Sequence, residues 1–199
     1  MGRYLKLIVA LVIAISTMTT AQNVVGYYPQ WVLANLQIEE IEFDVVTHVI
    51  HSFAWPNVDG SISSYDGMFG SGMSDVVHEQ GAKFLLSLGG WGNHEGFEAV
   101  SADAGLRESF IYNLASILTI NEYDGVDLDW EFPESEADRD NLNLLVSEMD
   151  SIFFALDPDW MITMVDPIDK LKEMYIEDIV EYGKNSKSDS TDDDSAASD

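Results

Sequence analysis

Cysteine is absent from this chain of 199 residues. Its absence excludes disulfide bonds, zinc sites built on thiolates and cysteine nucleophiles, so any chemistry must come from carboxylates, hydroxyls, histidines or aromatic rings. Basic residues are scarce as well, since nine Lys and Arg stand against 36 Asp and Glu, and the formal net charge is −27. Such a chain repels phosphate groups and anionic lipid headgroups, which argues against nucleic acid or a membrane surface as partner and favours a neutral one.

Long hydrophobic runs are also missing, and the apolar run at Leu7–Ile15 has only nine residues. A membrane-spanning helix needs about 20, so a transmembrane anchor fits poorly. Arg3 and Lys6 precede the run, and the small residues Thr19-Thr20-Ala21 follow it. This pattern is typical of a secretory signal peptide. We therefore expect residues 1–21 to be removed after Ala21 and the mature protein to be secreted, with no membrane association after cleavage.

The end of the chain has a composition of its own. Residues 185–199 contain five Ser and five Asp, and neither an aromatic side chain nor an aliphatic one larger than Ala. Such a segment cannot bury enough apolar surface to fold, so we expect a disordered, solvated tail. A calcium-binding segment or a linker is the alternative. Residues 22–184 are left as the expected globular domain, which agrees with the 46% hydrophobic content of the chain.

Five short apolar runs, rich in β-branched or aromatic residues and bounded by Gly, Pro, Asn or Asp, predict five strands. They are Val24–Tyr28, Val45–Phe53, Phe84–Leu88, Gly125–Glu131 and Met161–Val165. Apolar residues at helical spacing predict one helix over residues 106–118 and another over residues 142–156. Strands that alternate with helices form βαβ units, so the sequence predicts an α/β fold with a parallel sheet.

The fourth run carries a row of acids. Because side chains of a strand alternate between its two faces, Val, Leu and Trp face one side of the sheet and three carboxylates face the other. The carboxylates are Asp127, Asp129 and Glu131. Same-face neighbours lie about 6.6 Å apart at Cα, so three charges in a confined space repel, and at least one carboxyl should keep its proton near neutral pH. A protonated carboxyl among ionised ones is suited to act as a general acid.

Two other interpretations of the row fit less well. A solvated edge conflicts with the strict alternation with apolar residues. A calcium loop conflicts with the spacing, because Phe132 stands where an EF-hand needs Gly and Asp138 where it needs a bidentate Glu. The four histidines show no metal-ligand spacing, so we expect no metal and no other cofactor. A carboxylate cluster for cleavage of glycosidic bonds fits best.

The segment Asp124–Glu131 resembles the DxxDxDxE signature of family 18 glycoside hydrolases, the chitinases. Ser87–Trp91 is similar to the SxGG segment that ends the third strand of that family, at the expected distance upstream. Further segments are similar to the first, second and fifth strands of the family: Gly26–Trp31, Thr47–Ala54 with His51 where Tyr is more usual, and Met161–Val165. The resemblance extends from about residue 24 to about residue 182.

This resemblance implies a TIM (β/α)8 barrel with the row at the C-terminal end of its fourth strand. It also implies a retaining, substrate-assisted hydrolysis of β-1,4-linked N-acetylglucosamine polymers such as chitin. In this mechanism Glu131 is the general acid and then the base, and Asp129 orients the acetamide group of the substrate. Asp127 shares a proton with Asp129, and Asp124 matches the first, more structural position of the signature.

The resemblance also implies residues that bind sugar. Tyr27, Phe53 and Trp91 are expected to contact the substrate, because flat aromatic side chains pack on the apolar faces of pyranose rings. Gly89 and Gly90 are expected to let the backbone approach the sugar. For Tyr27 and Phe53, filling the barrel is an equal alternative. Trp55 is a weaker candidate for such a contact, and Trp31 and Trp130 are expected in the core.

The expected strands are fewer than a complete barrel needs. A barrel of this kind takes about 250 residues, whereas the five predicted strands suggest one truncated after about five βα units. Segments like those on the family's sixth and eighth strands are not found. We therefore expect the N-terminal part of a catalytic barrel that, alone, folds poorly and has little activity, with a dimer of partial barrels as the alternative. A non-catalytic chitinase-like lectin is the second function class, although such lectins typically lack the acid that Glu131 supplies. The sequence predicts no oligomeric state.

Overall fold

The computed structural model describes residues 22–93 and 95–164. The expected signal peptide, residues 1–21, and the acidic tail, residues 185–199, lie outside the described residues, so export and the nature of the tail stay predictions. The chain divides into two compact units after Ile162, and the fold below is that of the first, apart from the last two residues of its final strand.

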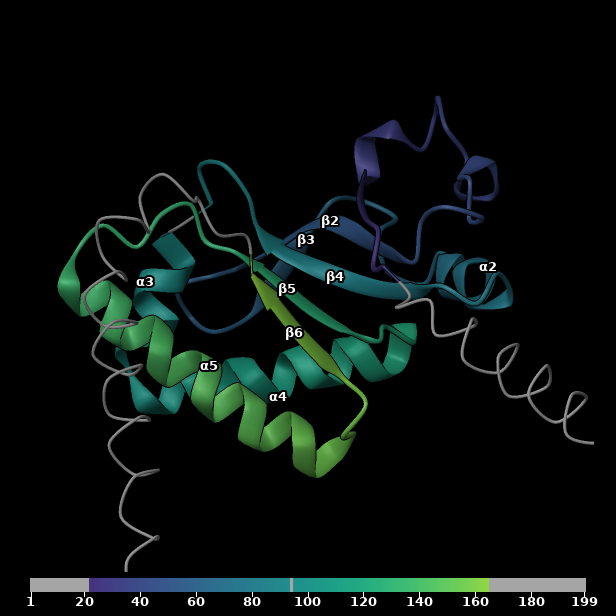
Figure 1. The fold of residues 1–199 in the computed structure, drawn as a ribbon. Coiled ribbons are helices and arrows are strands. Elements are labelled where there is room, and N and C mark those ends of the chain that lie inside the picture. Colours follow the sequence, from purple (N-terminus) through teal and green to yellow (C-terminus); the bar gives the residue numbers. More distant parts are fainter. Residues whose placement is uncertain (1–21, 94, 165–199) are drawn as a thin grey trace, which may run out of the picture. The chain divides into compact units, whose positions relative to one another are not determined.

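Six strands form one sheet within the described residues (Figure 1). They are β1 Val25–Pro29, β2 His48–Pro56, β3 Ile62–Ser64, β4 Lys83–Gly89, β5 Gly125–Asp129 and β6 Met161–Met164. The strand order is β1-β2-β4-β5-β6, and β3 pairs with β2 as an antiparallel arm. The pairs β1–β2, β2–β4 and β4–β5 are parallel, which confirms the parallel sheet that the sequence predicts.

Both predicted helices are present and longer than the patterns that reveal them. They are α4 Ala104–Asn121 and α5 Glu136–Leu156. Each begins at a capped residue, since Asp103 accepts a hydrogen bond from the backbone of Leu106, and Ser135 forms a capping box with Asp138. The sequence analysis missed the helices α2 Met73–Glu79 and α3 Glu95–Ala102 and the short 3₁₀ helices η1 Gln30–Val32 and η2 Ile38–Glu40.

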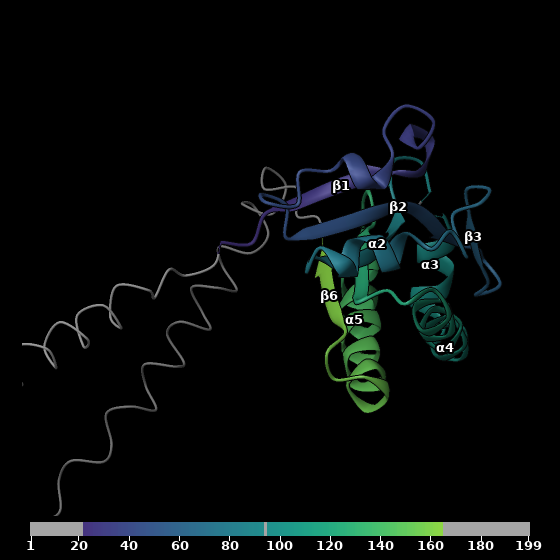
Figure 2. The same ribbon diagram turned by 90° about the vertical axis from the view of Figure 1, so that its right-hand side faces the viewer.

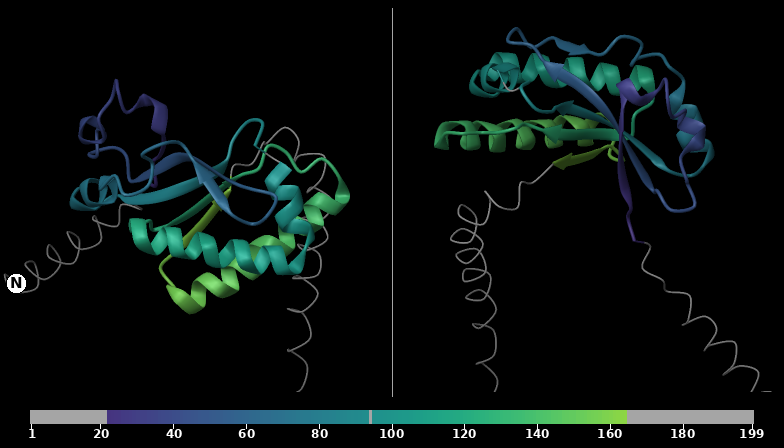
Figure 3. Two further views of the ribbon diagram at one scale, coloured as in Figure 1. Left: turned by 180° about the vertical axis from the view of Figure 1, so that it is seen from behind. Right: turned by 90° about the horizontal axis from the view of Figure 1, so that it is seen from above.

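The helices α4 and α5 lie side by side against one face of the sheet (Figures 2 and 3). The core forms between this face and the helices, where Val126 and Leu128 of β5 pack with buried residues such as Phe110 and Leu145. Trp130 belongs to the same cluster, as predicted, and its ring stacks on Phe97 with a centroid distance of 5.3 Å. The alternation of β5 is thereby confirmed, because its apolar side chains face the helices.

Trp31 is a correction to the sequence analysis. Its side chain is 54% exposed, although a core position was expected. It follows β1 in the 3₁₀ helix η1, which buries Gln30 and turns the indole toward solvent. Among the described residues, no helix is both long and apolar enough to cross a membrane.

Candidate active site

The acid row lies on the face of the sheet that points away from the helices, because the apolar residues of β5 occupy the other face. Asp127 is 2% exposed and Asp129 is 5% exposed, and both sit within β5. Glu131 follows two residues beyond the end of the strand and is half-buried. The row therefore runs from the interior of the sheet to its C-terminal edge, where the third carboxylate reaches solvent.

Asp127 is held by hydroxyl groups from two other strands. Tyr27 of β1 donates a hydrogen bond to Oδ2 of Asp127 over 2.8 Å, and Ser87 of β4 donates to the same oxygen over 2.9 Å. Ser87 lies directly opposite Asp127 in the register of β4 and β5. The sequence analysis placed Ser87 in a motif but gave it no role in the site. Only the pairing of the two strands reveals that role.

Asp129 is the member of the row whose pKa is raised, from an ordinary 3.8 to about 7. Burial is the main cause, and the negative charges of Glu131 and Asp127 and a hydrogen bond with Glu131 raise the pKa further. A proton is therefore shared within this cluster near neutral pH, as the repulsion argument predicts. The pKa of Tyr27 is also raised, by burial and by its hydrogen bond to Asp127, so this hydroxyl keeps its proton and remains a donor.

Two glycines at the C-terminal end of β4, its last residue Gly89 and the following Gly90, bring three strands together at the C-terminal edge. At Gly89, with φ +112°, a Cβ atom would lie 2.3 Å from the backbone oxygen of Asp129. The N–H group of Gly90 donates to this oxygen over 2.9 Å. A Cβ atom at Gly90 would lie 3.1 Å from the ring of Phe53. The close approach that the structure describes is thus to Asp129 and Phe53, and the expected approach to a sugar stays a prediction.

The aromatic residues predicted to bind sugar differ in exposure. Tyr27 is exposed although its hydroxyl reaches into the row, and Phe53, within β2, is half-buried. Trp91 is 83% exposed and follows the two glycines. The centroid of the Phe53 ring lies 6.1 Å from that of Trp31, which places Trp31 beside the candidate site. Sequence reasoning missed Trp31 because nothing in its neighbourhood marks the exposed side of a 3₁₀ turn.

Asp124 lies apart from the other three acids, at the opposite end of β5. It accepts hydrogen bonds from Lys83 Nζ at 2.6 Å and the backbone N–H of Phe84 at 2.8 Å, and it pairs with His78 at 2.7 Å. Burial opposes ionisation of Asp124, but these partners outweigh it and lower its pKa. The geometry supports a structural role, which is the one the first signature position implies.

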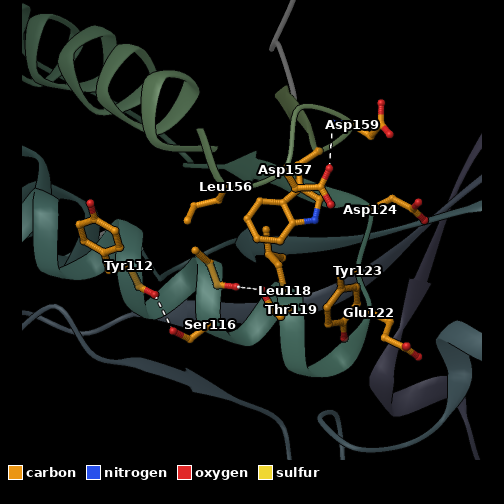
Figure 4. Close-up of a pocket in the computed structure, with 12 residues that line it drawn as sticks. Tyr112, Ser116, Leu118, Thr119, Glu122, Tyr123, Asp124, Leu156, Asp157 and Asp159 are labelled. Atoms are coloured by element: carbon orange, nitrogen blue, oxygen red, sulfur yellow. Dashed lines mark hydrogen bonds between the residues drawn. The ribbon is translucent and has the colours of Figure 1, made fainter. Parts of the chain in front are cut away.

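A pocket of about 570 Å³ also lies at the Asp124 end, between α4 and the turn that follows α5 (Figure 4). Leu156 and Tyr112 line it, and carboxylates of Glu122, Asp157 and Asp159 surround it. None of the residues predicted to bind sugar or to act on it contributes, apart from Asp124 at its margin. Its place at the other end of β5 separates it from Glu131, so the candidate site is the edge and not this pocket.

No group of three or more His, Asp or Glu side chains in residues 22–93 and 95–164 has a geometry that could hold a metal ion. The carboxyl groups at the C-terminal edge are suited to proton transfer. A buried pair, Asp127 and Asp129, adjoins a more accessible acid, Glu131, at an edge lined by aromatic rings.

Comparison with known proteins gives a family match over residues 23–188, to "Glycosyl hydrolases family 18". The endochitinase of Manduca sexta is 26% identical over 187 residues, which covers 84% of this chain and 34% of that protein. A chitinase-like effector of Moniliophthora roreri is 26% identical over 115 residues, which covers 56% of this chain and 28% of that protein. The chain thus spans about a third of the length of these relatives.

Solved structures agree on the fold. A mutant of a GH18 chitinase from Cycas revoluta, in complex with (GlcNAc)4, matches with a TM-score of 0.62 and 23% identity. The match covers 70% of this chain and 44% of that one. Together with the alternating helices and parallel strands, this likeness confirms the α/β barrel class, of which the described elements form a part.

Proposed function

Because the chain belongs to family 18 of the glycosyl hydrolases, we propose that its carboxylate row serves the hydrolysis of β-1,4-linked N-acetylglucosamine polymers, with Glu131 as general acid and base. The observation that carries the proposal is the placement of Asp127, Asp129 and Glu131 in one row that ends at the C-terminal edge of β5, where burial and neighbouring negative charges raise the pKa of Asp129 to about 7. A neutral polymer also suits a chain with a net charge of −27.

In the proposed reaction Glu131 protonates the glycosidic oxygen as the bond to the anomeric carbon breaks. The acetamide oxygen of the substrate attacks that carbon, so the intermediate is an oxazolinium ion and no enzyme carboxylate becomes bonded to the sugar. Glu131, now ionised, takes a proton from the water molecule that attacks the anomeric carbon and opens the oxazolinium ring. Two successive displacements at the anomeric carbon give net retention of its configuration.

The neighbouring acids have supporting roles. Asp129 accepts a hydrogen bond from the acetamide N–H and thereby aims the attacking oxygen. Its proton is shared with Glu131 through their hydrogen bond, so Asp129 turns toward the substrate as Glu131 is prepared to donate. Asp127 stays in place because Tyr27 and Ser87 both donate to its Oδ2. Its negative charge favours the protonated form of Asp129 until the acetamide group arrives.

Saccharide binding without cleavage is the second candidate function. One relative, from Moniliophthora roreri, is named a chitinase-like effector, a name that does not describe it as an enzyme. The presence of Glu131 favours the enzyme, because cleavage needs a proton donor at this position whereas binding alone does not.

One experiment separates the two candidates. Turnover of a fluorogenic chitotriose-type substrate and binding of chitotetraose are measured on the whole chain and on Glu131→Gln, whose amide keeps the shape but has no proton to give. The proposal is supported if the whole chain hydrolyses the substrate, even slowly, and if Glu131→Gln lowers this rate about 10² to 10⁴-fold while binding is retained. Binding without hydrolysis by either form favours the non-catalytic alternative, and hydrolysis that Glu131→Gln leaves unchanged would overturn the assignment of the acid.

A further inference from the structure

The pocket of about 570 Å³ at the Asp124 end of β5 is large enough for a small molecule (Figure 4). We call it the basal pocket. Its apolar surface comes from α4, from the end of α5 and from the turn before β6, through Tyr112, Leu118, Leu156 and Trp160. Tyr112 is 49% exposed and Leu156 is 54% exposed, so solvent reaches these walls. Open apolar surface of this kind often marks a binding site.

Hydrogen bonds fix the wall of the basal pocket that faces α4. In the turn after α5, Oδ1 of Asp157 accepts from the N–H of Asp159 over 3.0 Å, and the carbonyl of Asp157 accepts from the N–H of Trp160 over 3.2 Å. The N–H of Met161 then donates to the carbonyl of Asp124 over 2.9 Å, which ties this turn to the start of β5. A ligand therefore meets a preformed cavity, and preorganisation lowers the entropy lost on binding.

Carboxylates surround the basal pocket where the helix dipoles disfavour them. Both α4 and α5 end here, and neither has a basic residue in its last turn. Glu122 is the C-terminal cap residue of α4, Asp157 is that of α5, and Asp159 follows two residues later. The C-terminal end of a helix is the negative end of its dipole, so it attracts cations and repels carboxylates. At its other end α5 follows this rule, since Glu136 and Asp138 lie in its first turn.

The polar groups around the basal pocket favour a ligand that donates hydrogen bonds. The hydroxyls of Ser116 and Thr119 on α4 already donate to backbone carbonyls one turn earlier, over 2.9 Å each, so they offer a ligand only their lone pairs. Within residues 22–93 and 95–164, neither Glu122 nor Asp159 forms an ion pair. The two bases at the margin pair with Asp124 instead. A cation with N–H groups would satisfy these acceptors.

We propose that the basal pocket binds a small organic cation, an amine or amidine carried on a flat apolar body. Its charged group lies between the two helix ends, beside Glu122 and Asp159, and its body lies against the apolar walls. The indole of Trp160 suits both parts, because an aromatic face attracts a cation and also packs on apolar surface. The net charge of −27 favours the approach of such a ligand. The proposal is independent of hydrolysis, since Glu131 lies beyond the other end of β5.

Three probes that differ in the charge of one group test the proposal. They are 2-naphthamidine, 2-naphthamide and 2-naphthoate, which carry a positive, a neutral and a negative group on the same two rings. Dissociation constants are measured by NMR titration of the whole chain. We expect the amidine to bind about tenfold more tightly than the amide, and the naphthoate not to bind. High salt should weaken binding of the amidine and leave binding of the amide unchanged.

Two substitutions locate the bound cation. Glu122→Gln and Asp159→Asn keep the size of the side chain and remove its charge. Each should weaken binding of the amidine about twofold to fivefold, which is the worth of one exposed ion pair, and leave binding of the amide unchanged. Asp140→Asn is the matched control, because Asp140 is an exposed acid near the start of α5 and its substitution changes the net charge equally.

Three results would overturn the proposal. One is that the amidine does not bind, or binds no more tightly than the amide. Another is that Asp140→Asn weakens binding of the amidine as much as Glu122→Gln and Asp159→Asn do, because the charge of the whole chain would then decide the affinity. The third is that Glu131→Gln weakens binding while both pocket variants retain it, which would place the cation at the acid row. None of these results bears on the proposed hydrolysis, which is measured separately.

Discussion

The hydroxyl of Tyr27 donates a hydrogen bond to Asp127 over 2.8 Å, although three inter-strand steps separate β1 from β5. In a flat sheet three steps would amount to about 14 Å, well beyond the reach of a tyrosine side chain. The sheet must therefore curve until its first and fourth barrel strands face each other across the interior. This bond is direct evidence of barrel curvature.

Replacing Tyr27 with Phe should destabilise the fold. Asp127 is buried and accepts this bond, so Tyr27→Phe removes a donor from a carboxyl group that water does not reach. A loss of about 1–3 kcal/mol in the free energy of unfolding is expected from urea denaturation. Tyr112→Phe, on α4, is the control and should change little. Equal effects of the two substitutions would contradict a specific role for the bond.

Asp129 should make the folded protein less stable as the pH rises, which is the opposite of the usual effect of an aspartate. Its pKa in the folded state, about 7, lies above the ordinary 3.8, so the folded protein holds a proton that the unfolded chain releases between these values. The stabilising contribution is complete below about pH 3.8 and is lost as the pH rises through 7. Relative to Asp129→Asn, the wild-type free energy of unfolding should fall between pH 4.5 and 8. A constant difference across that range would refute the assignment.

Gly89, the last residue of β4, and Gly92, in the turn that follows, should respond very differently to an added methyl group. In Gly89→Ala the new Cβ would lie 2.3 Å from the backbone oxygen of Asp129 and 2.9 Å from the ring of Phe97, so β4 and β5 would have to separate. Gly92, with φ +85°, has no heavy atom within 4 Å of such a Cβ. Gly92→Ala should cost about 1–2 kcal/mol through its backbone alone.

Gly89→Ala should cost more than about 3 kcal/mol or prevent folding, because overpacking adds to the backbone strain. Thermal unfolding followed by circular dichroism distinguishes the two variants. The reverse order of melting temperatures would show that β4 and β5 can move apart more easily than the register suggests.

Asp124→Asn should weaken the fold without weakening sugar binding. The substitution removes the negative charge that pairs with Lys83 and His78, at a side chain that is only 14% exposed. A loss of about 1–3 kcal/mol is expected in denaturant unfolding. The dissociation constant for chitotetraose should stay within about twofold of the wild-type value, because Asp124 and Glu131 lie beyond opposite ends of β5. Weakened binding by a fully folded variant would bring Asp124 into the site.

The sequence predicts those parts of this structure in which apolar residues recur at the spacing of a strand or a helix. The alternation from Val126 to Glu131 is enough to place the acids on one face, and apolar spacing is enough to find α4 and α5. The arm β3 has three residues and α2 has seven, too few for either period to stand out. The role of Ser87 depends on which strands meet, and that information lies outside any local pattern.

The separation of 100 residues between Tyr27 and Asp127 has a consequence for the time at which the site forms. A ribosome adds about 5–20 residues per second, so the tyrosine is made roughly 5–20 s before its acceptor. During this interval β1 can pair with β2, but Tyr27 has no carboxylate to bind. The acid row can therefore acquire its bond to Tyr27 only after β1, β2, β4 and most of β5 have been synthesised, so the site depends on strands made at widely separated times.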